Sequence, residues 1–198
     1  MPSLSVNQLV SETRKAMLGK GFSFGVADDI AFAVGHLARY NIAPSAEIIH
    51  LLQTPLKNTP QPASHQDDAI ITNADSDIAD VMAAIDLADA YDASRLVLVG
   101  LLYPQLSLAL ISLRQSPPTG SWAGQKGALL HHLFTSSPGD ITLYRNSFMP
   151  EAQSDWPARI DIDQDAYEHL KEFAHHTYVP SSAKSREAGA GAGLNDND

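Results

Sequence analysis

The chain has 198 residues, of which 44% are hydrophobic and 18% are charged, and it contains no cysteine. This composition excludes collagen-like and wholly disordered chains, and the lack of cysteine excludes disulfide scaffolds, thiol nucleophiles and cysteine-ligated metal sites. The formal net charge is −10 and the 13 basic residues are spread thinly, so we expect neither nucleic acid nor an anionic membrane surface as a partner. The first residues lack the basic region and apolar run of a secretory signal, so we expect a cytoplasmic protein.

Two helices are predicted in the first forty residues. The segment Ser5–Gln8 has the spacing of a capping box, and Gly19 and Gly21 favour the end of the helix that follows it. Apolar residues at helical spacing predict a second helix that starts near Ser23 or Phe24 and ends at Asn41.

A third helix, a loop and a fourth helix are expected next. Pro44 suits the first position of a short helix that extends to about residue 53. The segment 54–68 carries three prolines without periodicity and indicates a surface loop. The pattern over 77–91 then predicts an amphipathic helix.

The segment 96–113 is free of charged residues and is long enough to cross a bilayer as a helix. Pro104 lies near its middle, and Leu106, Leu108 and Leu110 alternate with smaller residues as in a strand. We therefore expect a buried β-hairpin here rather than a membrane-spanning helix.

The C-terminal third is predicted to contain short elements. The segment 128–134 fits one or two helical turns, and 141–145 and 159–162 alternate as strands. Asp163 is in position to cap a last amphipathic helix, and Pro180 ends the structured part.

Helices first, then clustered strands and a closing helix, predict an α+β fold with N-terminal helices, a small antiparallel sheet and an extended Gly-rich C-terminal tail. Regular βαβ alternation is absent, which argues against a doubly wound fold. We expect a single α+β domain over 1–180 and a Gly-rich tail over 181–198. The sequence suggests one internal division, a helical lobe over 1–53 followed by the loop 54–68.

The ending Ala188–Asp198 and, more loosely, the opening Ser5–Leu37 are similar to an uncharacterised bacterial family, domain of unknown function 3726. These two segments lie at opposite ends of the chain, so the resemblance implies that the whole length is one member of that family. It implies no activity.

The tail offers candidate substrate-binding groups. Gly191 and Gly193 leave backbone amides uncovered for an anion, and the planar guanidinium of Arg186 suits a carboxylate or phosphate. Asp196 and Asn197 supply oxygen ligands of the kind that bind hard cations. Three alternatives stay open at this point: a disordered tail, a tail docked on its own or a neighbouring subunit, and a direct ligand site.

Histidines are the other candidate chemistry. His131 and His132 lie between a Gly-rich segment and a turn, where a catalytic loop can sit, and we take them as candidate proton-transfer residues. Glu172 and His175 have a metal-ligand spacing, but no second Glu-x-x-His occurs in the sequence, so we expect no metal site. No cofactor is indicated.

Two functions follow from these observations. The leading hypothesis is a protein that acts through association, as a homo-oligomer or an accessory subunit, with itself or another protein as partner and its tail docked. The alternative is a small-molecule enzyme with an anion-binding pocket beneath the tail, in which Arg186 binds the anion and His131 or His132 moves a proton.

Overall fold

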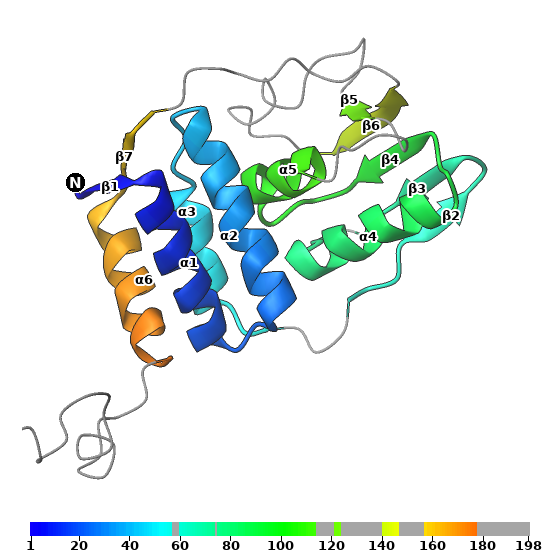
Figure 1. The fold of residues 1–198 in the computed structure, drawn as a ribbon. Coiled ribbons are helices and arrows are strands. Elements are labelled where there is room, and N and C mark those ends of the chain that lie inside the picture. Colours follow the sequence, from blue (N-terminus) through cyan, green and yellow to red (C-terminus); the bar gives the residue numbers. More distant parts are fainter. Residues whose placement is uncertain (57–59, 74, 114–120, 124–139, 147–156, 178–198) are drawn as a thin grey trace, which may run out of the picture.

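The computed structural model describes residues 1–56, 60–73, 75–113, 121–123, 140–146 and 157–177, and Figure 1 shows their arrangement. The helices in these ranges are α1 (Val6–Lys20), α2 (Phe24–Arg39), α3 (Ser45–Gln53), α4 (Ile78–Ala90), α5 (Pro104–Leu113) and α6 (Gln164–His175). The strands are β1 (Ser3–Ser5), β2 (Ser64–Gln66), β3 (Ala69–Ile71), β4 (Arg95–Leu98), β5 (Ser121–Ala123), β6 (Ile141–Asn146) and β7 (Arg159–Asp161). The predicted α+β class is confirmed.

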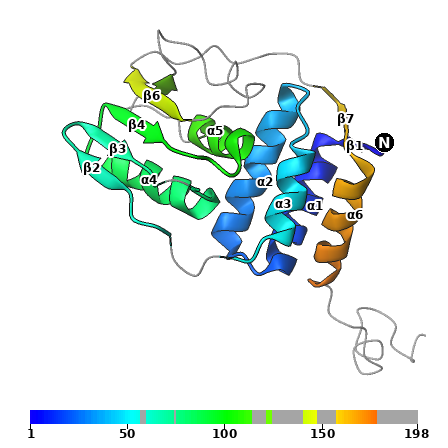
Figure 2. The same ribbon diagram turned by 180° about the vertical axis from the view of Figure 1, so that it is seen from behind.

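Four helices form one side of the molecule. Helices α6, α1 and α2 stand side by side, and α3 lies behind them, as the opposite views in Figures 1 and 2 show. The first and last parts of this layer are joined by a two-stranded antiparallel sheet, in which Leu4 of β1 is opposite Ile160 of β7.

The other side is a five-stranded sheet of order β2-β3-β4-β6-β5. Strands β3 and β4 are parallel, with Ile70 beside Leu96, and α4 makes the crossover between them. The remaining pairs are antiparallel, so the sheet is mixed. The short apolar strand β3 was not expected from the sequence, and with α4 and β4 it forms a single βαβ unit.

The hairpin predicted over 96–113 is wrong. This segment forms strand β4 and helix α5, and Pro104 is the first residue of the helix rather than part of a turn. Residues 106–111 are all buried, so the helix has no polar face to give a helical period. No helix within the described ranges is both long and apolar enough to span a membrane.

The other helix boundaries agree closely with prediction. Ser5 and Gln8 form the capping box of α1, and Gly21 ends that helix with φ 106°. Asp77 forms a capping box with Asp80 at α4, and Asp163 caps α6 through the backbone N–H of Asp165 and Ala166. Helix α2 ends two residues before the predicted Asn41.

Two glycines let the helices of the first layer approach each other closely. A Cβ on Gly19 of α1 would lie 1.8 Å from the carbonyl oxygen of Phe173 in α6. A Cβ on Gly35 of α2 would lie 2.6 Å from a methyl group of Val10 in α1. The spacing of α6, α1 and α2 therefore depends on these two positions.

The buried side chains of both sides form one hydrophobic cluster. It runs from Leu9 and Met17 of α1 through Leu37 of α2 to Leu96 of β4 and Leu106 of α5. Helix α5 packs against α2 and connects the helical layer to the sheet. The face of α2 that points away from this core is thereby left at the surface.

Candidate functional site

The residues predicted from the sequence as site residues all lie outside the described ranges: His131, His132, Arg186, Gly191, Gly193, Asp196 and Asn197. Their roles, and the pocket beneath the tail that they would form, therefore stay predictions. The candidate site within the described ranges consists of other residues.

A groove runs between α1 and α2 at the surface. It encloses about 370 Å³. We call it the α1–α2 groove, and its lining residues are Asn7, Val10, Ser11, Arg14, Asp28, Ala31 and Phe32. All of them come from two helices whose backbones are held together by the close approach at Gly35.

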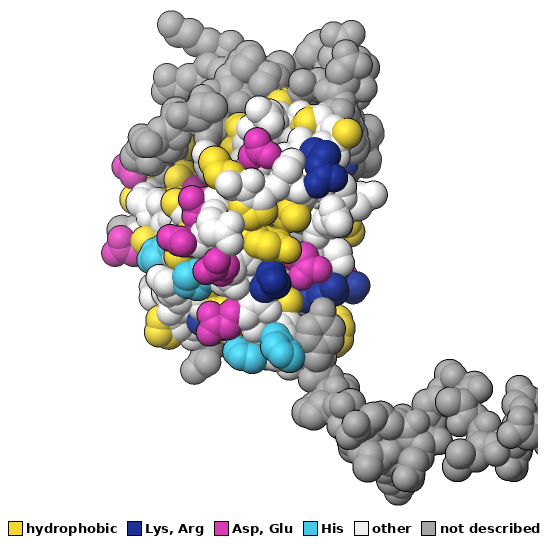
Figure 3. All heavy atoms as spheres, turned by 90° about the vertical axis from the view of Figure 1, so that its left-hand side faces the viewer, with side chains coloured by type: hydrophobic (Ala, Val, Ile, Leu, Met, Phe, Trp, Pro, Cys, Tyr) yellow, Lys and Arg dark blue, Asp and Glu magenta, His cyan; other side chains and the backbone are white. Residues whose placement is uncertain are grey.

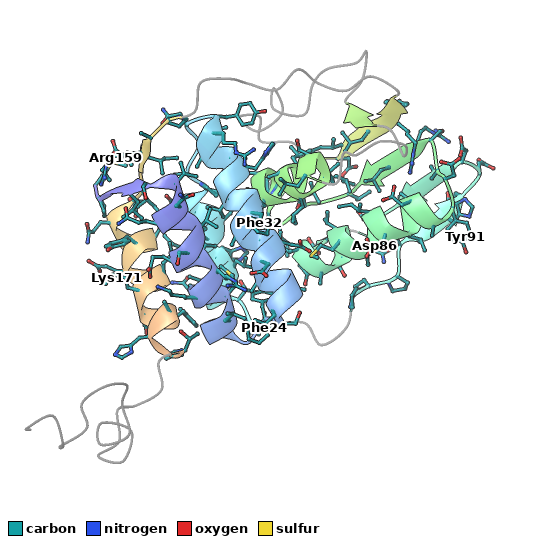
Figure 4. The ribbon with its side chains drawn as sticks, in the orientation of Figure 1. Phe24, Phe32, Asp86, Tyr91, Arg159 and Lys171 are labelled. Carbon is teal, nitrogen blue, oxygen red and sulfur yellow. The ribbon has the colours of Figure 1, made fainter. Side chains whose placement is uncertain are left out.

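The shape of the groove follows from small side chains next to a large one. Ala31 is buried and Ser11 is exposed. Because both side chains are small, neither fills the space between the helices. Phe32 stands beside them with 58% of its surface exposed, and Phe24, about two helical turns away, is 71% exposed. Figure 4 shows both rings on α2, outside the core. Of the two, Phe32 lines the groove and so places an exposed apolar surface beside the hollow.

The groove carries one charge of each sign, and the two are paired with each other. Arg14 of α1 donates hydrogen bonds from Nε and Nη2 to the Asp28 carboxylate of α2. Both side chains are partly exposed, at 49% and 34%, so the pair contributes little stability but neutralises the groove. Elsewhere, on the side of the molecule formed by α6 and α1, acidic, basic and histidine side chains are interspersed with hydrophobic ones (Figure 3).

A second hollow continues the groove towards α5. It encloses about 450 Å³, shares Asn7, Val10 and Phe32 with the groove, and extends to Arg39 and Leu113. Burial lowers the pKa of Arg39 from its ordinary value, and the nearby Tyr40 partly offsets this effect. Phe32 therefore has a hollow on each side along the helix surface.

The pKa of the Glu47 carboxyl group is raised from its ordinary value. Its two carboxylate oxygens accept hydrogen bonds from the backbone N–H groups of Gln105 and Leu106, at 2.8 and 2.9 Å. Burial raises the pKa of Glu47, and the two backbone hydrogen bonds offset only part of the shift. Because both oxygens bind the first turn of α5, Glu47 acts as a cap for that helix.

A small apolar cleft lies where the helical layer meets α4. It is lined by Phe22, Leu51, Ile78 and Tyr103, with the α4 cap Asp77 at its edge. It encloses about 60 Å³, which is room for a few water molecules only. This cleft is too small for a substrate pocket of the usual size.

The described part of the chain holds no group of three or more His, Cys, Asp or Glu side chains placed to bind a metal ion. Glu172 and His175, considered above for their spacing, lie on the last two turns of α6. Within the described ranges, the α1–α2 groove is the feature that best fits a binding function.

Sequence reasoning missed the two aromatic residues of this site. Phe24 and Phe32 are eight residues apart on α2, and both lie on the side of the helix that carries Asp28. A large aromatic residue among charged ones on the polar face of an amphipathic helix is the signal that was available.

Residues 4–90 match the model of a family described as "Protein of unknown function (DUF3726)". No curated protein and no solved structure matches the chain. The matched region contains α1, α2 and therefore the whole groove. It includes the opening segment on which the predicted resemblance rested, whereas the ending Ala188–Asp198 lies outside it. Over residues 4–90, less than half of its length, the chain is therefore similar to this family of proteins of unknown function.

Proposed function

We propose that this protein acts by association, as an oligomer or accessory subunit in the cytoplasm, and that the α1–α2 groove is its docking surface. The observation that carries the proposal is Phe32, a large aromatic side chain that is 58% exposed beside a groove of about 370 Å³. Aromatic residues at the centre of a docking surface contribute a large share of binding energy.

The composition of the groove supports this function over catalysis. Apart from Asn7, its uncharged lining residues are apolar or small, and its two charged groups, Arg14 and Asp28, already bind each other. A protein surface that covers it would bury Phe32 while the paired charges stay at the rim, which is the arrangement of protein interfaces.

The C-terminal tail is the second part of this proposal. We place the docked tail on the protein itself or on its partner, because a Gly-rich extended segment can follow a narrow surface. The small-molecule enzyme remains a prediction that rests on residues outside the described ranges.

A photo-reactive phenylalanine analogue at position 32 tests the docking surface in the cells that make the protein. We expect irradiation to give one discrete adduct from position 32. The matched control is position 91 on the far side of the molecule, where Tyr91 is 57% exposed (Figure 4). No adduct at position 32, or the same adducts from both positions, would contradict the proposal.

A further inference from the structure

The ridge and the groove on this surface belong to the same face. Phe32 of α2 forms the ridge, and Ser11 of α1 and Ala31 of α2 lie next to it in the groove. Helices pack when the ridge of side chains on one enters the groove of another. A face that carries both features side by side can pair with a copy of itself across a two-fold axis, because each copy then supplies a ridge and receives one.

The charges on this face favour the same occupant. The whole chain carries a formal net charge of −10, so two copies repel each other over most of their surfaces. At the groove, however, Arg14 and Asp28 neutralise each other. A neutral face with an apolar centre is where two acidic copies can meet at the least electrostatic cost.

The length of the face also fits. Helix α2 has 16 residues, so it is about 24 Å long, and Phe24 and Phe32 lie about 12 Å apart along its axis. Asp28 lies between the two rings, one turn from each, and its carboxylate is paired with Arg14.

We infer that a second copy of this chain docks on the α1–α2 groove, with Phe32 of each copy seated in the groove of the other. This inference rests on the proposed function and names the partner at the same surface. A helix of a different protein is the competing occupant, and the experiment below separates the two.

Two variants test this inference, one at the Phe32 ridge and one in the groove that receives it. Phe32→Lys removes the ridge, which is also one wall of the groove, but keeps Ser11, Ala31 and the other lining residues, and the new ammonium group lies one turn from Asp28 on α2. Ser11→Glu blocks the groove and leaves the ridge intact, and the new carboxylate lies one turn from Lys15 on α1. Both positions are exposed, so both variants should fold. Tyr91→Lys is the control at an exposed aromatic residue away from the groove.

Molar mass in solution is measured for each protein and for an equal mixture of the two groove variants. We expect wild type and Tyr91→Lys to have twice the chain mass of 21.3 kDa, and each groove variant alone to have the mass of one chain. The dissociation constant should rise by at least about thirtyfold in each groove variant, as for the loss of a central interface residue. The mixture should recover dimers, because Phe32 of the Ser11→Glu variant can still contact Ser11 and Ala31 of the Phe32→Lys variant, and the introduced charges have opposite signs.

Three results would overturn the second copy as partner: a wild-type protein of single-chain mass at every concentration, a dimer that survives both groove substitutions, or a mixture that does not recover dimers. The photo-reactive group at position 32 then decides the broader proposal. An adduct with a different protein retains the docking surface and rejects the second copy, whereas no adduct rejects both.

Discussion

Glu47 connects two parts of the molecule through its carboxylate. It belongs to α3 in the helical layer, and both its oxygens accept hydrogen bonds from the first turn of α5, which packs beside the sheet. The backbone N–H groups at a helix start have no partner within the helix, so a carboxylate that binds two of them is well placed. Its burial nevertheless opposes ionisation.

This burial predicts how stability depends on pH. The pKa of Glu47 in the folded protein is raised above its ordinary value of 4.5, so the folded state holds the proton more tightly than the unfolded state does. The contribution of Glu47 to stability is therefore greatest below pH 4.5 and declines as pH rises through the raised pKa. Denaturant unfolding from pH 4.5 to neutrality should show wild type losing stability relative to Glu47→Gln. A constant difference between the two proteins across this range would contradict the assignment.

Glycine positions give a second prediction at the residue scale. An alanine at Gly19 would force its Cβ against the backbone of α6, 1.8 Å from the Phe173 carbonyl oxygen, and α6 would have to move. We expect Gly19→Ala to lower the free energy of unfolding by about 1–3 kcal/mol or more, as overpacking does. Gly25→Ala is the matched control, because its Cβ meets open space and should add about 0.5–1 kcal/mol of helix stability. Equal effects of Gly19→Ala and Gly25→Ala on the denaturation midpoint would contradict this prediction.

At the scale of elements, Arg145 joins β6 to the end of α4. Its Nε donates to the carbonyl of Ala93, and Nη2 donates to the carbonyl of Ala88 and to the Asp89 carboxylate, at 3.0 to 3.1 Å. The side chain is only 14% exposed. The guanidinium thus binds the negative end of the α4 dipole and the loop that leads to β4.

Substitution of Arg145 should therefore cost more than substitution of an exposed arginine. We expect Arg145→Met to destabilise the protein by about 2–3 kcal/mol, because it leaves two carbonyls and a carboxylate without their donor. Arg14→Met is the comparison, and its exposed ion pair should contribute less than about 1 kcal/mol. Chemical unfolding of both variants measures the difference, and a smaller loss for Arg145→Met would refute this role.

Local signals in the sequence were sufficient for the helix ends, because caps depend on residues three or four positions apart. Ser5 and Asp163 cap their helices as predicted, and the helix predicted from residue 77 begins at Ile78 with Asp77 as its cap. Helix α5 could not be predicted in the same way, since it is buried on every side and its cap, Glu47, lies 58 residues before Gln105. A short, fully apolar run does not distinguish strand from helix by its period.

The parallel pairing of β3 with β4 escaped prediction for a similar reason. Three residues, Ala69–Ile71, carry no detectable alternation, and their pairing depends on the crossover through α4. The groove could not be predicted from neighbouring residues in the sequence either, because it requires the close approach of α1 to α2 at Gly35. The signal that the sequence did contain is the pair of aromatic residues, Phe24 and Phe32, on the polar face of α2.

For the molecule as a whole, the tail is tested by truncation. Full-length protein is compared with a version that ends after Glu187, by molar mass in solution and by thermal melting. If the tail is docked, the shorter protein should have fewer chains per particle or a melting temperature several degrees lower, because docked segments add contacts that the truncation removes. The same number of chains per particle and the same melting temperature in both proteins would reject a docked tail in the isolated protein.

Coverage of the α1–α2 groove by a partner is also a property of the whole molecule. Since the chain has no cysteine, a single Ser11→Cys substitution places one thiol at an exposed position that lines the groove. The same thiol in a Phe32→Lys background reports the uncovered groove, and Asp86→Cys on the exposed side of α4 is the control (Figure 4).

The decisive measurement is the rate of thiol alkylation in the native protein at high concentration. We expect slow alkylation of Ser11→Cys, a rate at least about tenfold higher when Phe32→Lys is added, and no change at Asp86→Cys. Rapid alkylation of Ser11→Cys with Phe32 in place would mean that nothing covers the groove, and would contradict its role as a docking surface.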